Sequence, residues 1–160
     1  MADSEFIFGE FNRTLDERFR LSIPTQMIEP LTGPGEELLL VKERPGALSL
    51  WNAERWQAKF DVGIDLIAAK FKAGRLEGKI ADLQQLGRLL STRQRNVTLA
   101  GKGRLLIPEG FREFLGVDAG GEVLVVGAAL CVEIWRPSAW LENLEQEIPE
   151  FHKLLDTLSG

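Results

Sequence analysis

The stretch Arg20-Leu-Ser-Ile-Pro24 returns later in the chain as Arg104-Leu-Leu-Ile-Pro108, at an offset of 84 residues. The same offset relates three residues upstream to their counterparts: Asn12, Thr14 and Leu15 to Asn96, Thr98 and Leu99. It also relates the first two tryptophans of the chain to the last two: Trp51 and Trp56 to Trp135 and Trp140. So many identities at one spacing do not arise by chance in 160 residues. The chain is therefore a tandem duplication of one unit.

The sequence of each copy predicts the same order of short secondary-structure elements. A first strand and a second strand flank a charged turn, at residues 6–15 and 20–23, and at residues 96–99 and 104–107. The second strand ends at a proline that can open a short helix, at residues 25–31 and at residues 109–115, the latter stopped by Gly116. Two apolar strands follow, at residues 38–41 and 47–51, and at residues 123–126 and 130–135. A helix closes each unit, after Asn52 and at Pro137.

Helical spacing fills the region between the copies, residues 60–91, where Gly74 and Gly78 are expected to separate two helices. The tail, residues 149–158, is expected either to pack on a neighbour or, because it is short, to fray. It places four apolar side chains on one helical face: Phe151, Leu154, Leu155 and Leu158. We therefore predict a first repeat at residues 5–60, a helical connector at 61–92, a second repeat at 93–145 and a C-terminal tail at 146–160.

The acidic total charge hides two basic segments. The chain has 19 Lys and Arg against 24 Asp and Glu, a net charge of −5, which by itself argues against binding to phosphates. Residues 12–20 and 93–104 nevertheless hold seven basic and two acidic side chains. We expect an acidic body that presents two basic elements, a distribution suited to double-stranded DNA.

Several other classes of function are disfavoured. No stretch reaches the roughly 18 apolar residues of a membrane helix, and the acidic start MADSEFIFGE is unlike a signal peptide, so a cytoplasmic protein is expected. One cysteine and one histidine cannot build a structural zinc site. No nucleophile, base or metal constellation is evident, so we expect neither enzyme activity nor a cofactor. The glycine-rich residues 116–121 lack a following Gly-Lys-Ser/Thr and indicate a turn. The tryptophans favour packing, with base stacking as the alternative.

The hairpin at residues 14–24 and its copy carry the predicted site. An extended hairpin can direct basic side chains toward a duplex, where phosphate contacts supply affinity and base contacts supply sequence preference. The four residues expected to contact DNA are Arg18, Arg20, Lys102 and Arg104, with supporting phosphate contacts from Arg13, Arg93 and Arg95. Asp16 is expected to be structural, because phosphates repel a carboxylate. An alternative is that Arg20 only pairs with Asp16 to stiffen the turn.

These residues resemble the MraZ family. The motif Asp-x-x-x-Arg, followed by a strand and a proline, is matched by Asp16 and Arg20, and Phe8-Gly-Glu-Phe11 resembles the family's entry strand. Residues 99–108 match the motif again, and the tryptophan-containing segments extend the likeness over nearly all the chain. Two positions depart from the pattern: Ala100 stands where aspartate is expected and Phe19 where glycine is usual.

The resemblance implies an α+β fold in which tandem AbrB-like hairpin units complete one pseudo-symmetric double-psi or swapped-hairpin barrel, with flanking helices. It also implies a ring of several identical subunits. The expected function is a sequence-specific, nucleoid-associated transcriptional regulator, a repressor of the division and cell-wall gene cluster that binds promoter-proximal repeats. The alternative is an oligomeric scaffold of the same fold that has lost specific DNA binding, which Ala100, Phe19 and the acidic body motivate.

Overall fold

Strands from both repeats interleave in one antiparallel sheet, so the chain has the mixed α+β character expected from the sequence. The computed structural model describes residues 6–160, and the first five residues of the acidic start lie outside them. The six-stranded sheet has the order β1-β7-β8-β4-β3-β5, and β2 and β6 form a separate two-stranded sheet. The bounds are β1 Glu10–Thr14, β2 Arg20–Ser22, β3 Leu38–Arg44, β4 Ala47–Asn52, β5 Gln94–Val97, β6 Arg104–Leu106, β7 Glu122–Gly127 and β8 Val132–Trp135.

The two repeats exchange strands. The first strand of repeat one, β1, pairs with β7 of repeat two, and β5 of repeat two pairs with β3 of repeat one. An approximate twofold axis relates the halves, because Leu21 pairs with its own equivalent Leu105, and Ser49 pairs with its own equivalent Glu133. The two halves therefore form one interlocked body.

The core lies between the large sheet and two short helices. α1 (Thr25–Thr32) buries Met27 and Leu31, and α4 (Phe111–Leu115) covers the equivalent place in the second repeat. Leu21 and Leu105 are fully buried in the same core. Removing such apolar side chains from water is the largest favourable contribution to folding.

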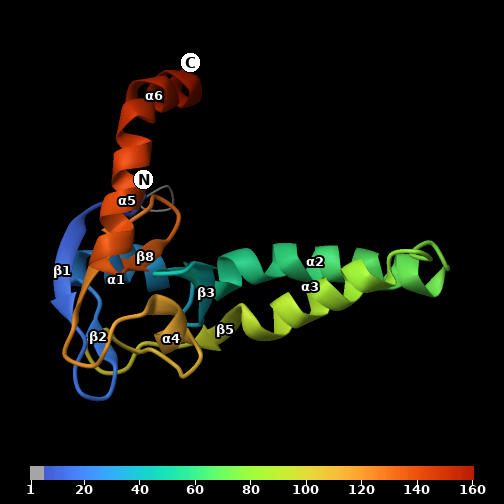
Figure 1. Cartoon of the computed structure of the whole chain (residues 1–160), viewed down its shortest axis with the longest axis horizontal. Helices are drawn as coiled ribbons and strands as arrows, with labels where there is room; N and C mark the ends of the chain where they lie inside the picture. Colours follow the sequence, from blue (N-terminus) through green and yellow to red (C-terminus); the bar gives the residue numbers. More distant parts are fainter. Residues whose placement is uncertain (1–5) are drawn as a thin grey trace.

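Two pairs of helices project from this body (Figure 1). One pair, which we call the arm, consists of α2 (Ala53–Lys72) and α3 (Ile80–Thr92), separated around Gly74 and Gly78 as the sequence predicted. The other, which we call the rod, consists of α5 (Pro137–Glu147), the 3₁₀ turn η2 (Ile148–Glu150) and α6 (Phe151–Ser159). The Asn52 side chain caps α2 by accepting a hydrogen bond from the backbone N–H of Arg55 at 2.9 Å.

All four tryptophans pack in pairs. Trp51 at the end of β4 meets Trp56 in α2 edge to face, with ring centroids 5.3 Å apart. Their equivalents Trp135 and Trp140 repeat this contact at 5.3 Å. Each pair joins a strand to the helix that follows it. The tryptophans therefore pack against one another, as the sequence favoured, and do not form an open row of stacking rings.

Several predicted boundaries are wrong by a few residues. The first strand was expected at residues 6–15, but β1 begins at Glu10, because its partner β7 ends at Gly127 and only an isolated bridge joins Ile7 to Ala129. The strands expected at 96–99 and 130–135 are found at Gln94–Val97 and Val132–Trp135, where partners lie alongside. The tail helix begins at Phe151, two residues after its expected start.

The helix expected at 109–115 begins only at Phe111. Gly110 has a φ of 87°, which a right-handed helix cannot contain, and Glu113 accepts a hydrogen bond from the Gly110 backbone N–H at 2.9 Å. The expected boundaries between residues 60 and 61 and between 145 and 146 fall inside α2 and α5, which are continuous helices.

The buried leucine pair at the twofold axis gives a stability prediction. Leu21→Ala and Leu105→Ala should each lower the free energy of unfolding in urea by about 2–5 kcal/mol, because each leaves a cavity in the core. Leu106→Ala, in the same ribbon but with its side chain 51% exposed, should cost about 0.5 kcal/mol or less. Equal losses for Leu21→Ala and Leu106→Ala would contradict the inward orientation of Leu21.

Candidate nucleic-acid interface

The two basic hairpins meet in the β2–β6 ribbon. Its register pairs Arg20 with Leu106, Leu21 with Leu105, and Ser22 with Arg104. Alternate side chains of a strand point to opposite faces, so the buried leucines leave Arg20 and Arg104 on the outward face. These two arginines are diagonal neighbours across the ribbon, with an expected separation of about 7–8 Å at the base of their side chains.

The two hairpin turns have the same geometry. In the first, the Asp16 N–H donates to the Arg20 carbonyl at 3.0 Å; in the second, the Ala100 N–H donates to the Arg104 carbonyl at 2.8 Å. Because β2 and β6 are antiparallel, the turns lie at opposite ends of the ribbon. Each turn also carries one exposed basic side chain: Arg18 in the first and Lys102 in the second. The ribbon therefore presents four basic side chains, two on its face and one at each end.

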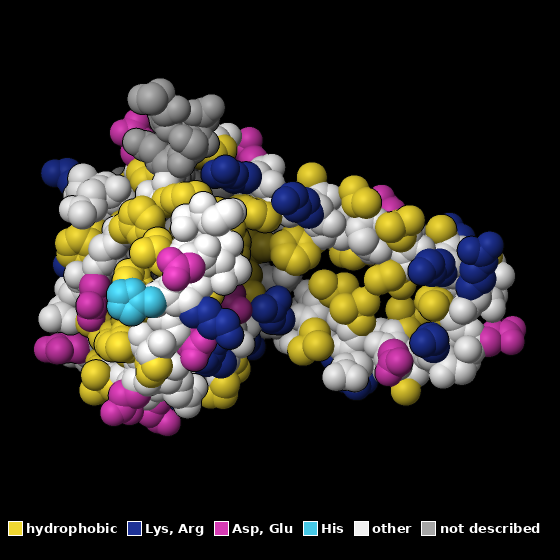
Figure 2. All heavy atoms as spheres, turned by 90° about the horizontal axis from the view of Figure 1, so that it is seen from above, with side chains coloured by type: hydrophobic (Ala, Val, Ile, Leu, Met, Phe, Trp, Pro, Cys, Tyr) yellow, Lys and Arg dark blue, Asp and Glu magenta, His cyan; other side chains and the backbone are white. Residues whose placement is uncertain are grey.

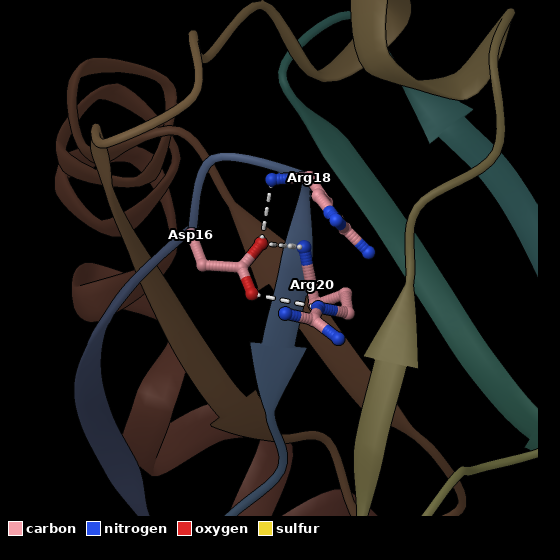
Figure 3. A network of polar contacts seen from close by, with 3 residues as sticks. All are labelled: Asp16, Arg18 and Arg20. Carbon is pink, nitrogen blue, oxygen red and sulfur yellow. Dashed lines mark hydrogen bonds and ion pairs between the residues drawn. The ribbon is translucent and has the colours of Figure 1, made fainter.

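Asp16 organises the first turn (Figure 3). Its Oδ1 accepts hydrogen bonds from the backbone N–H groups of Arg18 at 2.8 Å and Arg20 at 2.9 Å. Its Oδ2 accepts from Nε of Arg20 at 2.7 Å, which is also an ion pair. Of the guanidinium nitrogens of Arg20, only Nε contacts the carboxylate, so the two terminal nitrogens remain available to an acceptor outside the chain.

The second turn works without a carboxylate. Ala100 replaces the aspartate, and within residues 6–160 Arg104 makes no ion pair. Its guanidinium instead lies over its own turn, 3.7 Å from the place that a Cβ on Gly101 would occupy. Arg104 is exposed, whereas Arg20 is half-buried, with 38% of its side chain exposed. The two arginines thus share a position in the ribbon but differ in what orients them.

Phe19 fits a conformation that usually selects glycine. Its φ is 61°, and its equivalent Gly103 has a φ of 88°. A Cβ on Gly103 would lie 2.3 Å from Cδ1 of Ile28, so the second copy has no room for a side chain there. At the first turn the place of Ile28 is taken by its equivalent in the second copy, Arg112, whose guanidinium lies 4.4 Å from the centroid of the Phe19 ring. The two turns therefore have the same backbone conformation, although Phe19 and Arg112 meet at the first turn where Gly103 and Ile28 meet at the second.

The net positive charge is greater at the second end of the ribbon, which carries the second turn with Lys102, than at the first end, which carries the turn with Arg18. Glu17 sits beside Arg18, and Glu109, Glu113 and Asp118 share a surface hollow with Phe19 and Arg112. By contrast, Lys102 lies between two glycines, and residues 93–104 contain no acid. An approaching phosphate therefore meets less repulsion at the second turn.

The three predicted supporting arginines are not on the ribbon but in or beside the large sheet. Arg13 in β1 lies over the Phe11 ring at 5.5 Å, and Arg95 in β5 lies over the Phe111 ring at 5.7 Å. Arg93 precedes β5 and pairs with Glu43 at 3.4 Å. The structure brings together Arg18, Arg20, Lys102 and Arg104 in one element and leaves these three on neighbouring strands.

Sequence reasoning missed two basic residues that share an aromatic contact with the residues discussed above. Arg112 joins the first end of the ribbon through Phe19, and its Nε donates to the Ile107 carbonyl at 2.6 Å. Lys42 shares the Phe111 ring with Arg95, at 5.0 Å from its centroid. Neither belongs to a duplicated basic motif, so no sequence signal singled them out.

The groups that the sequence excluded from chemistry have ordinary surroundings. Cys131 is buried, and desolvation raises the pKa of its thiol, so it packs as a small apolar side chain. His152 is exposed on α6. Within residues 6–160 no group of three His, Cys, Asp or Glu side chains is placed to hold a metal ion, and no helix is both long and apolar enough to span a bilayer.

Known proteins resemble this chain at its full length and in its second copy. A family model described as "MraZ protein, putative antitoxin-like" matches residues 91–158. A transcriptional regulator MraZ of Syntrophomonas wolfei is 25% identical over 94% of this chain and 94% of its own length. The protein of the same name from Thermomicrobium roseum is 28% identical over 94% of this chain and 97% of its own. The chain is thus similar to MraZ proteins over nearly all of its length, and the MraZ family model matches its second copy.

Both copies of the motif that resembles MraZ proteins are visible in three dimensions. The Asp-x-x-x-Arg spacing places the carboxylate under the backbone of its own turn and the arginine at the start of the ribbon strand. The family model covers the second copy, whose turn lacks the aspartate. The MraZ relatives align across both copies.

The hydrogen bonds of Asp16 predict an acid-sensitive turn. The backbone N–H of Arg20 above all, then that of Arg18 and the Arg20 guanidinium, hold the pKa of Asp16 below its ordinary value of 3.8. A lowered pKa in the folded state means that this carboxylate stabilises the fold above pH 3.8, and that the contribution is lost as pH falls through the lower folded value. Titration of the Asp16 carboxyl carbon by NMR should give a midpoint below 3.8.

The control is Asp16→Asn, which keeps an oxygen acceptor but cannot ionise. Its stability should lack this part of the dependence on pH. A midpoint at or above 3.8 in the wild type would show that the three hydrogen bonds do not favour the charged carboxylate.

Proposed function

We propose that this chain is a DNA-binding transcriptional regulator whose β2–β6 ribbon enters the major groove of double-stranded DNA. The observation that carries the proposal is the placement of Arg20 and Arg104 on the outward face of a ribbon anchored by fully buried leucines. The major groove is about 12 Å wide and admits a two-stranded ribbon. The name transcriptional regulator carried by the MraZ relatives supports the same function.

The two arginines of the ribbon face would read base edges. A guanidinium fork matches O6 and N7 of guanine, and both terminal nitrogens of Arg20 are left over from its contact with Asp16. Arg18 and Lys102 at the ribbon ends would contact phosphates on either side of the groove, with Arg13, Arg93 and Arg95 as outlying contacts. Asp16 acts through the turn, by orienting Arg20.

The interlocked strands support a finer description of the fold. We assign them to a swapped-hairpin barrel of the AbrB type, in which residues 5–60 and 93–145 are two halves, 61–92 a connector and 146–160 a tail. Both halves are needed to complete the ribbon, since β2 comes from one and β6 from the other. A single chain then presents one complete DNA-reading unit.

Assembly of several chains into a ring would let weak individual contacts act together. Linked sites bind with an effective concentration that raises the overall affinity by orders of magnitude. A ring that engages successive repeats upstream of a promoter would block transcription, which makes the protein a cytoplasmic, nucleoid-associated repressor. Family resemblance points to the division and cell-wall gene cluster as the target, and the proposed activity is binding without catalysis.

The double variant Arg20→Ala plus Arg104→Ala tests the ribbon directly. Binding to a short duplex from upstream of the gene, with room for one chain, should weaken by about 30-fold or more, because each base-reading arginine contributes about 1–3 kcal/mol. Fluorescence anisotropy at low and near-physiological salt measures this loss, with scrambled DNA for comparison.

The matched control is Arg75→Ala plus Lys79→Ala, which removes two exposed charges from the tip of the arm. It should bind nearly as wild type does. If the ribbon variant also binds as wild type does, the ribbon is not the interface. If the wild type binds the duplex at neither salt, the scaffold alternative stands.

The uneven charge of the ribbon ends gives a second DNA-binding prediction. Lys102→Ala should weaken binding to all sequences and reduce the slope of log affinity against log salt by about one. Arg18→Ala should have a smaller effect, because Glu17 already offsets the charge of Arg18. Anisotropy titrations at several salt concentrations provide the slopes, and a larger effect of Arg18→Ala would refute the assignment of the stronger end.

A further inference from the structure

The arm carries an apolar groove that nothing in the described part of the chain fills. On α2 the groove is lined by Ile64, Ile67, Ala68 and Phe71. On α3 it is lined by Leu83, Leu86, Gly87 and Leu90. Its volume is about 210 Å³, and Figure 2 shows apolar side chains along both sides of the space between the two helices. Exposed apolar surface of this kind marks an interaction site.

Gly87 leaves the α3 side of the groove open. Glycine is disfavoured inside a helix, yet Gly87 lies in the middle of α3. A Cβ built on it would meet no atom within 4 Å, so no neighbour in the described structure requires its small size. A larger side chain at this position would narrow the groove.

The rod ends in an apolar stripe that matches the groove. On α6 the side chains of Phe151, Leu154, Leu155 and Leu158 are 58%, 54%, 55% and 82% exposed. Their spacing of i, i+3, i+4 and i+7 is that of one helix face, and the lining residues of α2 and of α3 have the same spacing. Each of the three stripes is about 10 Å long at about 1.5 Å per residue. The stripe of α6 is therefore as long as the groove.

The rod cannot reach the groove of its own chain. α5 is fixed to the body by the contact of Trp135 with Trp140 and by a hydrogen bond of 2.8 Å from Arg44 to the buried Asn143. From this anchor the rod and the arm project in different directions (Figure 1). The α6 stripe is thus offered to another molecule.

The charges of the two projections are complementary. Residues 137–160, which contain the rod, have five acidic side chains and one lysine. Residues 53–92, which contain the arm, have seven basic and five acidic side chains. Opposite net charge favours approach of the rod to the arm over rod to rod or arm to arm.

We propose that α6 of one copy docks in the α2–α3 groove of a second copy. The inference rests on the proposed assembly and names the two surfaces that form it. Because the groove and the stripe are different patches, the contact is head to tail: every copy offers one of each. Such contacts close into a ring when the rotation between copies permits and otherwise extend as a filament.

The first test fills the groove. Gly87→Leu adds a side chain to the groove lining at a position where a Cβ meets no atom within 4 Å, and leucine suits a helix better than glycine does, so the chain should fold. In size-exclusion chromatography with light scattering, the wild type should have several times the monomer mass and Gly87→Leu the monomer mass. The control is Gly63→Leu, the same change in α2 outside the groove lining, which should keep the wild-type mass. A monomeric wild type, or an assembled Gly87→Leu, overturns the proposal.

The second test removes the stripe. Leu154→Gln plus Leu155→Gln should also give the monomer mass, whereas His152→Gln plus Thr157→Gln, on other faces of α6, should not. Mixing the Gly87→Leu chain with the Leu154→Gln, Leu155→Gln chain should then produce a complex of two chains, since one supplies an intact stripe and the other an intact groove. Absence of this complex overturns the docking, and assembly of the stripe variant alone would show that other surfaces join the copies.

These measurements contain no DNA, so they are independent of the proposed regulation. The monomeric variants should still bind a duplex with room for one chain as the wild type does. If the wild type and all variants have the predicted masses but none of them binds DNA, only the regulatory function fails. If DNA binding persists and the masses do not change, only the docking fails.

Discussion

The antiparallel pairing of β2 with β6 is the constraint on which the rest of the structure depends. Each strand has three residues and belongs to a hairpin that would be marginal alone in water. Pairing buries Leu21 against Leu105 and closes the approximate twofold axis between the repeats. The exchange of β1 and β5 between the halves follows from the same arrangement. Because the ribbon takes one strand from each repeat, two basic turns far apart in the sequence become the two ends of one element.

The duplicated halves have diverged most around this ribbon. The equivalent of Asp16 in the second repeat is Ala100, and that of Ser22 is Leu106, so the outward surface is only partly symmetric. The exchange of bulk between Phe19 with Arg112 and Gly103 with Ile28 is a compensated change, since each pair fills the same space with different chemistry. The backbone of the turn tolerates the positive φ of Phe19, and the ring stacks under a guanidinium that a glycine could not hold. The duplication thus kept the geometry and altered the electrostatics.

The molecule separates its surfaces by chemistry. The ribbon of the body carries basic side chains over a rigid core, whereas the arm carries an apolar groove and the rod an exposed apolar stripe, and the net charges of arm and rod are of opposite sign. Neither α3 nor α6 has a buried residue in the described structure. Isolated short helices gain little stability from propensity alone, so most helices depend on packing of an apolar face. A partner that covers these faces would supply the packing that the single chain lacks.

The sequence by itself determined the duplication, the hairpins and the starts of α1, α2 and α5. Repeats are visible because both copies kept the same residues at one spacing, and helix ends such as the Asn52 cap depend on local hydrogen bonds. The ribbon arginines could be chosen for the same reason, as they recur in the repeated motif. Only the tertiary structure decided which repeat each strand pairs with, because the copies offer similar apolar strands and nothing local distinguishes its own partner from the other. It also placed Arg13, Arg93 and Arg95 beside the large sheet and brought Arg112 to Phe19, since these positions depend on contacts between residues remote in the chain.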